Sequence, residues 1–278
     1  QLRACDGISE MSSLADIRLF LLDMDGTVYL GSRLLPGSLD FLRYLRETSR
    51  DHLFLTNNSS RNANYYAEKL TRLGWPAKPE EVLTSGEATA LYLGGLKPSA
   101  RVYLLGTPDL EQEFIEHGFV LTNEKPDYVV LGFDMTLTYE KLVQACDLVR
   151  SGVPFIATHP DFNCPTETGY IPDCGAMIAL ITASTGVKPQ VIGKPNREII
   201  DAMFRKKPVA RSQVAMVGDR LYTDIVMGHN AGVASILVLS GEAKREDIET
   251  APVKPDYVMS GLAELHAALR QADENRQK

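Results

Sequence analysis

Arg18-Leu-Phe-Leu-Leu-Asp-Met-Asp-Gly-Thr27 decides the fold class, because it joins an apolar run directly to an acidic turn. The run up to Leu22 is continuous, which is typical of a strand buried on both faces of a parallel sheet. Asp23 and Asp25 follow it, and residues two apart in an extended segment point the same way. Ligands of open α/β folds bind at the carboxyl ends of the strands, so these two acids mark a candidate site.

The alternation of strand-like and helical patterns continues outward from this stretch. Apolar runs at 52–56, 214–218, 235–239 and 255–259 are separated by helical spacing at 36–46, 64–73, 223–230 and 262–271. Such β-α alternation predicts a parallel sheet with helices on both faces. The expected fold class is therefore α/β, with a doubly wound, mostly parallel sheet and a Rossmann-like core.

The middle of the chain repeats this alternation by itself. Strand-like runs at 102–105, 128–131 and 154–157 are followed by helical patterns at 109–117, 139–150 and 175–185. This stretch is long enough for a second small α/β domain. We expect a core domain of residues 15–84 plus 187–278, an inserted domain of residues 85–186, and a disordered leader or cloning remnant at 1–14.

Composition narrows the class of function. The chain has 278 residues, 44% hydrophobic, and a net charge of −7, which argues against nucleic acid and anionic membranes as partners. No apolar run approaches the roughly 18 residues that span a bilayer. The start of the sequence shows no secretory signal, and none of the four cysteines forms a CxxC pair. We therefore expect reduced thiols and a cytoplasmic protein.

Three further polar motifs follow predicted strands or the inserted segment: Thr56-Asn-Asn-Ser-Ser60, Ile192-Gly-Lys-Pro195 and Gly218-Asp-Arg-Leu-Tyr-Thr-Asp224. Each of them alone is commonly an ordinary polar loop, and a lone DxD is common too. Together, and in this order, they gather carboxylates, hydroxyls and Lys194 at one edge of the sheet. An all-oxygen cluster without nearby His or Cys favours Mg²⁺ over zinc. Mg²⁺ with a lysine and a hydroxyl-rich loop suits a phosphoryl group.

With these motifs, the sequence resembles the haloacid dehalogenase-like hydrolase superfamily. The closer resemblance is to its NagD-like, or para-nitrophenyl phosphatase, branch (subclass IIA), and it extends over about residues 16–265. Ile156-Ala-Thr158 and Pro172-Asp-Cys-Gly-Ala176 in the middle segment also match that branch. Only about thirty residues separate Asp23 from Thr56, so an inserted cap fits only between Thr56 and Lys194. In family terms this is a C2-type cap, a lid that excludes water.

The resemblance implies a Mg²⁺-dependent phosphomonoester hydrolase that works through an aspartyl-phosphate. Asp23 would attack phosphorus, and Asp25 would protonate the leaving oxygen and then activate water. Thr56, Asn57 and Lys194 would hold the phosphoryl oxygens. The metal ligands would be Asp23, Asp25 through its backbone carbonyl, and Asp219, with Asp224 in support.

Several alternatives stay open at this stage. Dehalogenase members lack the second acid, and P-type ATPase relatives need membrane spans, so phosphoryl hydrolysis is favoured over both. A phosphomutase and a non-catalytic metabolite sensor remain as other interpretations. We expect a small phosphate ester as substrate, a sugar phosphate or nucleoside monophosphate and also para-nitrophenyl phosphate. Phosphoglycolate- and pyridoxal-phosphate-type activities are the alternatives, and the chain is expected to be a monomer or a cap-mediated homodimer.

The segment from Thr158 to Ala176 is predicted to be a loop of the cap that faces the core. It contains Asp161, Glu167 and Asp173 but no Lys or Arg. His159, Asp161 and Asn163 are the candidate substrate contacts, and carboxylates suit hydroxyl donors while repelling anions. This predicts a neutral, hydroxylated leaving group. The alternative is that these acids face solvent or cap helix ends.

Overall fold

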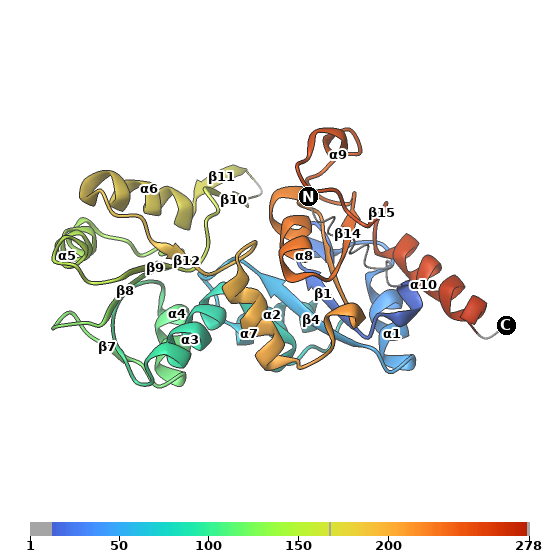
Figure 1. Ribbon diagram of the computed structural model, residues 1–278, viewed down its shortest axis with the longest axis horizontal. Helices are drawn as coiled ribbons and strands as arrows, with labels where there is room; N and C mark the ends of the chain where they lie inside the picture. Colours follow the sequence, from blue (N-terminus) through green and yellow to red (C-terminus); the bar gives the residue numbers. More distant parts are fainter. Residues whose placement is uncertain (1–12, 167, 277–278) are drawn as a thin grey trace, which may run out of the picture.

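A computed structural model describes residues 13–166 and 168–276. Most of the expected leader, Glu167 and Cys5 lie outside the described residues. Figure 1 shows two lobes along the longest axis of the molecule, each built on its own sheet. Helices α5 (Tyr139–Arg150) and α6 (Cys174–Thr185) lie at one end, and helix α10 (Leu262–Arg276) lies toward the other.

The larger sheet has six strands in the order β15-β14-β13-β1-β4-β5, and every neighbouring pair is parallel. Their bounds are Tyr257–Met259, Ala234–Val238, Val214–Gly218, Leu19–Asp23, Asp51–Thr56 and Val82–Thr84, in that order. Strand β1 lies inside the sheet, between β13 and β4. This arrangement confirms the predicted α/β class and its mostly parallel sheet.

Alternate residues of β1 show that helices cover both faces. Leu19 and Leu21 belong to a buried cluster with residues of α3 (Ser85–Leu96), α7 (Arg197–Lys206) and α8 (Val226–Ala231). Phe20 and Leu22 belong to another, with residues of α1 (Ser38–Glu47), α2 (Ala63–Arg72) and α10. A strand with apolar side chains on both faces has to be covered on both, which is why this stretch of sequence was decisive.

The smaller sheet has five parallel strands in the order β12-β9-β8-β6-β7. Their bounds are Gln190–Val191, Phe155–Ala157, Tyr128–Leu131, Arg101–Leu105 and Val120–Leu121. The sheet therefore continues to Val191, beyond the expected end of the inserted domain at residue 186. Helix α4 (Pro108–Glu116) also belongs to this lobe. The buried cluster around Leu19 includes Val102 and Val130 of this lobe, so the two lobes share packed apolar side chains.

Shorter elements complete the chain. A hairpin of β10 (Asn163–Thr166) and β11 (Gly169–Pro172) lies within the segment that we predicted to be a loop, so that prediction was wrong for these residues. The antiparallel pair β2 (Tyr29–Leu30) and β3 (Arg33–Leu34) follows the acidic turn. Short helical turns span Leu14–Asp16, Pro79–Glu81, Arg211–Gln213, Leu221–Ile225 and α9 (Asp247–Thr250). No helix in the described part of the chain is long and apolar enough to cross a membrane.

Candidate active site

The carboxyl edge of the six-stranded sheet gathers the polar residues that the sequence places after separate strands. Asp23 ends β1, Thr56 ends β4 and Asp219 follows β13. Lys194, just before α7, is buried between two acids: its Nζ lies 2.5 Å from Asp23 Oδ1 and 2.8 Å from Asp224 Oδ1. Segments that are far apart in the chain thus form one ion-paired cluster.

Local backbone geometry places Asp224 in this cluster. It lies in a π-helical turn, Leu221–Ile225, and its Oδ2 accepts a hydrogen bond from the Arg220 amide at 3.1 Å. A Cβ at Gly218 would lie 2.2 Å from Asp224 Cγ, so only glycine fits there. The glycine of the Gly218–Asp224 motif is therefore required by the close approach of a buried carboxylate.

Burial dominates the proton affinities of the cluster. It raises the pKa of Asp23 to about 8, with Asp224 and Asp219 adding to the rise and Lys194 opposing it. Burial also raises the pKa of Asp219 to about 6, again with Asp224 adding. For Lys194, burial lowers the pKa, but Asp224 and Asp23 outweigh it and the net pKa is raised. The ammonium therefore stays charged, and the site gathers more negative than positive charge.

The donor set fits a hard divalent cation. Carboxylate oxygens of Asp23, Asp219 and Asp224 lie within 4.8 Å of one another. Asp219 Oδ2 accepts from the Glu242 amide at 2.7 Å, while its buried Oδ1 has no hydrogen-bond partner among the described residues. The backbone of Gly26 and that of Gly241 pack closely around Asp219. A Cβ atom at either position would clash with Asp219 Oδ2, at 2.4 Å from Gly26 and 1.9 Å from Gly241. Three convergent carboxylates, one with a free buried oxygen, are what Mg²⁺ prefers in proteins.

The side chain of Asp25 is not part of that carboxylate group. It is exposed at the turn after β1 and lines a cavity of about 270 Å³. Although the side chain is accessible from the cavity, the surrounding protein removes part of its hydration and raises its pKa, against the charges of Lys69 and Arg220. A carboxyl group with a raised pKa is suited to donate a proton to a leaving group.

The cavity lies between the two lobes. Its lining includes Asp23, Thr56 and Lys194 from the core side, and Phe133, Asp161 and Asn163 from the smaller lobe. A neighbouring cavity of about 700 Å³ shares Asp25 and Arg220 with it and is lined further by Phe162, Tyr170 and Tyr222. Carboxylates and a buried lysine of the core thus face a small cavity between the lobes.

Comparison with known proteins identifies the class of this site. Residues 20–120 match the family profile described as haloacid dehalogenase-like hydrolase, and residues 191–265 match a second, HAD-hydrolase-like profile. An acid sugar phosphatase of Staphylococcus aureus is 42% identical over 255 residues, 91% of this chain and 98% of that protein. The chain belongs to the haloacid dehalogenase-like hydrolase family.

Solved structures place it in the NagD-like, para-nitrophenyl phosphatase branch of that family. The 4-nitrophenylphosphatase of Thermotoga maritima is 51% identical with a TM-score of 0.89, and the match covers 92% of this chain and 98% of that one. A protein described as a putative nagD protein is 52% identical with a TM-score of 0.82, covering 87% and 96%. Glycerol phosphate phosphatase of Mycobacterium tuberculosis, solved with calcium, is 34% identical with a TM-score of 0.86, covering 91% and 76%. This chain is accordingly a hydrolase of the phosphatase branch.

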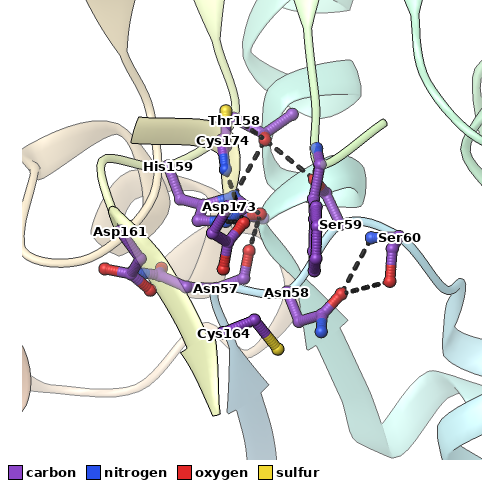
Figure 2. Close-up of polar contacts among 12 residues, drawn as sticks. Asn57, Asn58, Ser59, Ser60, Thr158, His159, Asp161, Cys164, Asp173 and Cys174 are labelled. Carbon is purple, nitrogen blue, oxygen red and sulfur yellow. Dashed lines mark hydrogen bonds and ion pairs between the residues drawn. The ribbon is translucent and has the colours of Figure 1, made fainter. Parts of the chain in front are cut away.

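In this hydrolase, Asn57 serves chiefly to connect loops. Its Nδ2 donates to Asp161 Oδ2 at 3.2 Å and to the Lys194 carbonyl at 3.1 Å, and its Oδ1 accepts from the Lys194 amide at 2.8 Å. Figure 2 shows Asn57 beside Asp161 of the smaller lobe. Because its hydrogen bonds to Asp161 and Lys194 engage the amide group, the side chain of Asn57 is not available for the phosphate contact that the sequence predicts. Thr56 Oγ1 accepts from the Asn58 amide at 3.1 Å, which shapes the same loop.

His159 does not lie where the sequence analysis expected it. Its side chain is buried and is not part of the cavity lining. Its Nε2 lies 2.8 Å from Asp173 Oδ1, and its Nδ1 lies 3.0 Å from Thr158 Oγ1. Thr158 in turn hydrogen-bonds Ser59 of the core at 2.9 Å (Figure 2). The prediction of a substrate contact was wrong, because both ring nitrogens contact neighbouring side chains of the smaller lobe inside the protein, at its junction with the core.

Asp161 and Asn163 do line the cavity, as expected, and Asp173 lines it as well as capping α6. Oxygens of Asp161 and Asp173 lie within 4.8 Å of a ring nitrogen of His159, so these three form a second group of potential ligands. The contact between His159 and Asp173 accounts for this cluster without an ion. It belongs to the junction between the lobes.

Sequence reasoning missed cavity residues on the core side, namely Tyr29, Tyr65, Tyr66, Lys69 and Arg220. Arg220 stands inside the Gly218–Asp224 motif and pairs with Glu242 at 3.1 Å, so the motif itself was a signal for it. Lys69 follows Tyr65 at an interval of four inside α2, which places the two on one helical face. That spacing was the available signal for Lys69.

Proposed function

We propose that this hydrolase is a Mg²⁺-dependent phosphomonoesterase that works through an aspartyl-phosphate on Asp23. Its substrates are small phosphorylated metabolites, a sugar phosphate or a nucleoside monophosphate, and para-nitrophenyl phosphate. One observation carries the proposal: Asp23 lies in contact with Lys194 and beside Asp219, whose buried oxygen has no partner in the described chain. Relatives named as acid sugar, nitrophenyl and glycerol phosphate phosphatases support it.

Asp23 is the nucleophile in this proposal. A bond forms between its free carboxylate oxygen and phosphorus while the ester P–O bond breaks. The carboxylate has to be ionised to attack, and the Lys194 ammonium at 2.5 Å favours that form against the effect of burial. Lys194 and Thr56 offer positive charge and a hydroxyl to the phosphoryl oxygens.

Asp25 transfers the protons. It gives its proton to the departing oxygen, and it then takes a proton from the water that attacks phosphorus and frees Asp23. Its exposure at the cavity, apart from the carboxylate cluster, suits this role. Asp23, Asp219 and Asp224, with the backbone carbonyl of Asp25, would hold Mg²⁺, which neutralises charge on the phosphoryl oxygens when bound.

We assign the smaller lobe, about residues 85–186 with β12, to a C2-type cap over the core, which consists of residues 15–84 and of 187–278 without β12. Support comes from the cavity, which takes residues of both lobes. Asp161 and Asn163 of the cap then contact the leaving group.

Release of inorganic phosphate from para-nitrophenyl phosphate tests the proposal. The wild-type protein with Mg²⁺ should turn over, and excess EDTA should stop it. Asp23→Asn should lower the rate of phosphate release by at least about 1,000-fold. Asp40→Asn, a substitution on the exposed side of α1, should leave this rate unchanged. No turnover of this ester or of a panel of phosphate esters would favour a metabolite sensor.

A further inference from the structure

The cavity wall formed by the core carries cations, whereas the cap loop from Thr158 to Ala176 contains no Lys or Arg. Tyr65 and Lys69 lie on one face of α2, Arg61 lies just before this helix, and all three line the cavity. The Arg61 guanidinium stacks over the Tyr65 ring at 4.9 Å, and the Lys69 ammonium lies over the Tyr29 ring at 3.8 Å. The ring of Tyr29 is buried, so it fixes the position of the Lys69 ammonium.

Lys69 differs from the other cations of the site in its lack of an acidic partner. Arg61 pairs with Asp109 at 3.3 Å, Lys194 with Asp23 and Asp224, and Arg220 with Glu242. For Lys69, no carboxylate lies within 4.0 Å among the described residues. A half-buried ammonium without a partner is a costly arrangement unless a ligand completes it.

The pKa of Lys69 agrees with its position in the cavity without an acidic partner. Burial lowers the pKa of Lys69, and the charge of Asp25 is what opposes this effect. Asp25 is the group assigned to the leaving oxygen, so Lys69 lies on the side of the cavity that the leaving group enters. Asp161, Asn163 and Asp173 lie on the cap side of the same cavity. The two sides therefore offer different chemistry, a positive charge from α2 and acceptors from the cap.

We propose that Lys69 is a specificity-determining residue that binds a carboxylate on the leaving group of the substrate. The favoured leaving group is a small hydroxy acid, with its carboxylate toward Lys69 and its hydroxyl groups toward Asp161 and Asn163. A cavity of about 270 Å³ suits a leaving group of this size. This inference rests on the proposed phosphatase function. It narrows the proposed small phosphorylated metabolites to those with a carboxylate on the leaving group. It thereby replaces the neutral sugar or nucleoside leaving groups, which were expected from the charges of the cap loop alone.

Two matched esters test the proposal: 3-phosphoglycerate and glycerol 3-phosphate, which differ in one carboxylate against one hydroxymethyl group. The readout is the ratio of their kcat/KM values at one pH, because any effect of Lys69 on Asp25 acts on both esters and cancels. Lys69→Met and Lys69→Gln should each lower the ratio by about 10-fold or more, the loss expected for one charge-assisted hydrogen bond. Lys69→Arg should retain most of the ratio.

Arg72→Met is the matched control, because Arg72 is an exposed cation on the same helix and is not part of the cavity lining. It should leave the ratio unchanged. Calorimetric binding of the two esters to the Asp23→Asn protein should show the same dependence on Lys69 without turnover. An unchanged ratio in both Lys69 variants overturns the inference, even if both rates fall. Absence of para-nitrophenyl phosphate hydrolysis by the wild-type protein would instead count against the phosphatase function. The calorimetric binding of the two esters would still test the role of Lys69.

Discussion

The side-chain amide of Asn57 donates to the Asp161 carboxylate at 3.2 Å, across 104 positions of sequence. The same amide group exchanges hydrogen bonds with the backbone of Lys194 on its other side. One buried side chain therefore connects the loop after β4, the loop that carries Asp161, and Lys194. The position of the cap loop and that of Lys194 depend on a common residue.

Asn57→Ala should lower both kcat/KM and stability. The substitution removes hydrogen bonds at a buried position, and we expect a loss of about 2 kcal/mol in the free energy of unfolding. Misplacement of Lys194 should lower kcat/KM by roughly 10-fold or more. Urea unfolding and steady-state kinetics measure the two effects. Asn64→Ala, at an exposed position of α2, is the control, and an Asn57→Ala protein with normal kinetics would exclude the connecting role.

Asp25→Asn should affect poor leaving groups more than good ones. Para-nitrophenolate departs without an acid, whereas an alkoxide needs a proton. The comparison should use kcat/KM, which reports the steps up to departure of the leaving group. We expect glycerol 3-phosphate to lose about 100-fold or more and para-nitrophenyl phosphate considerably less. Equal losses would rule out Asp25 as the acid.

Activity should depend on a divalent ion that prefers oxygen ligands. After removal of metal with EDTA, Mg²⁺ should restore turnover, and Ca²⁺ should inhibit because its looser coordination misplaces the nucleophile. Asp219→Asn keeps an acceptor for the Glu242 amide but removes a charge. It should raise the Mg²⁺ concentration for half-maximal activity by about 10-fold or more. Full activity of the wild-type protein in excess EDTA would exclude the proposed metal site.

Glu113 gives the stability of the protein a specific pH dependence. Its buried carboxylate accepts hydrogen bonds from Thr84 Oγ1 at 3.2 Å, and burial raises its pKa to about 8, with Glu87 adding. The folded state therefore keeps a proton that the unfolded chain loses above its ordinary pKa of 4.5. The stabilisation is complete below that value and is lost as the pH rises toward about 8.

Urea unfolding at pH 5 and pH 8 measures this effect. Glu113→Gln resembles the protonated acid. It should reduce the difference in the free energy of unfolding between pH 5 and pH 8 by about 3 kcal/mol. Glu111→Gln, on the same helix but outside the buried interior, should leave the difference intact. An identical difference in wild-type and Glu113→Gln proteins would contradict the raised pKa.

The core of the site was predictable from sequence because parallel strands end at one edge. Once the run before Asp23 is interpreted as a buried strand, the motifs with Thr56 and Asp219 have to meet there. Lys194 follows from the same topology, since its motif comes directly after the inserted segment. In the structure, Lys194 contacts Asp23 and Asp224 at 2.5 and 2.8 Å.

The cap and the cavity wall were not predictable in the same way. The β10–β11 hairpin contains Pro165, Gly169 and Pro172, which disfavour strands, and most of its side chains are exposed. It therefore lacks the alternating apolar pattern by which strands are predicted. The burial of His159 depends on Ser59 and Ser85, which lie 74 or more positions earlier in the chain. Lys69 looks like an ordinary surface lysine until the Tyr29 ring beneath it is known.

The central claim is the covalent aspartyl-phosphate on Asp23, and the Asp25→Asn protein provides its most direct test. With para-nitrophenyl phosphate the leaving group still departs, but water is no longer activated, so the phosphorylated enzyme should accumulate. Acid quenching and peptide mass spectrometry should then find a phosphoryl group on Asp23, with a matching burst of para-nitrophenolate. A protein that turns over this ester with no burst, and with no phosphoryl group on Asp23, would contradict the mechanism.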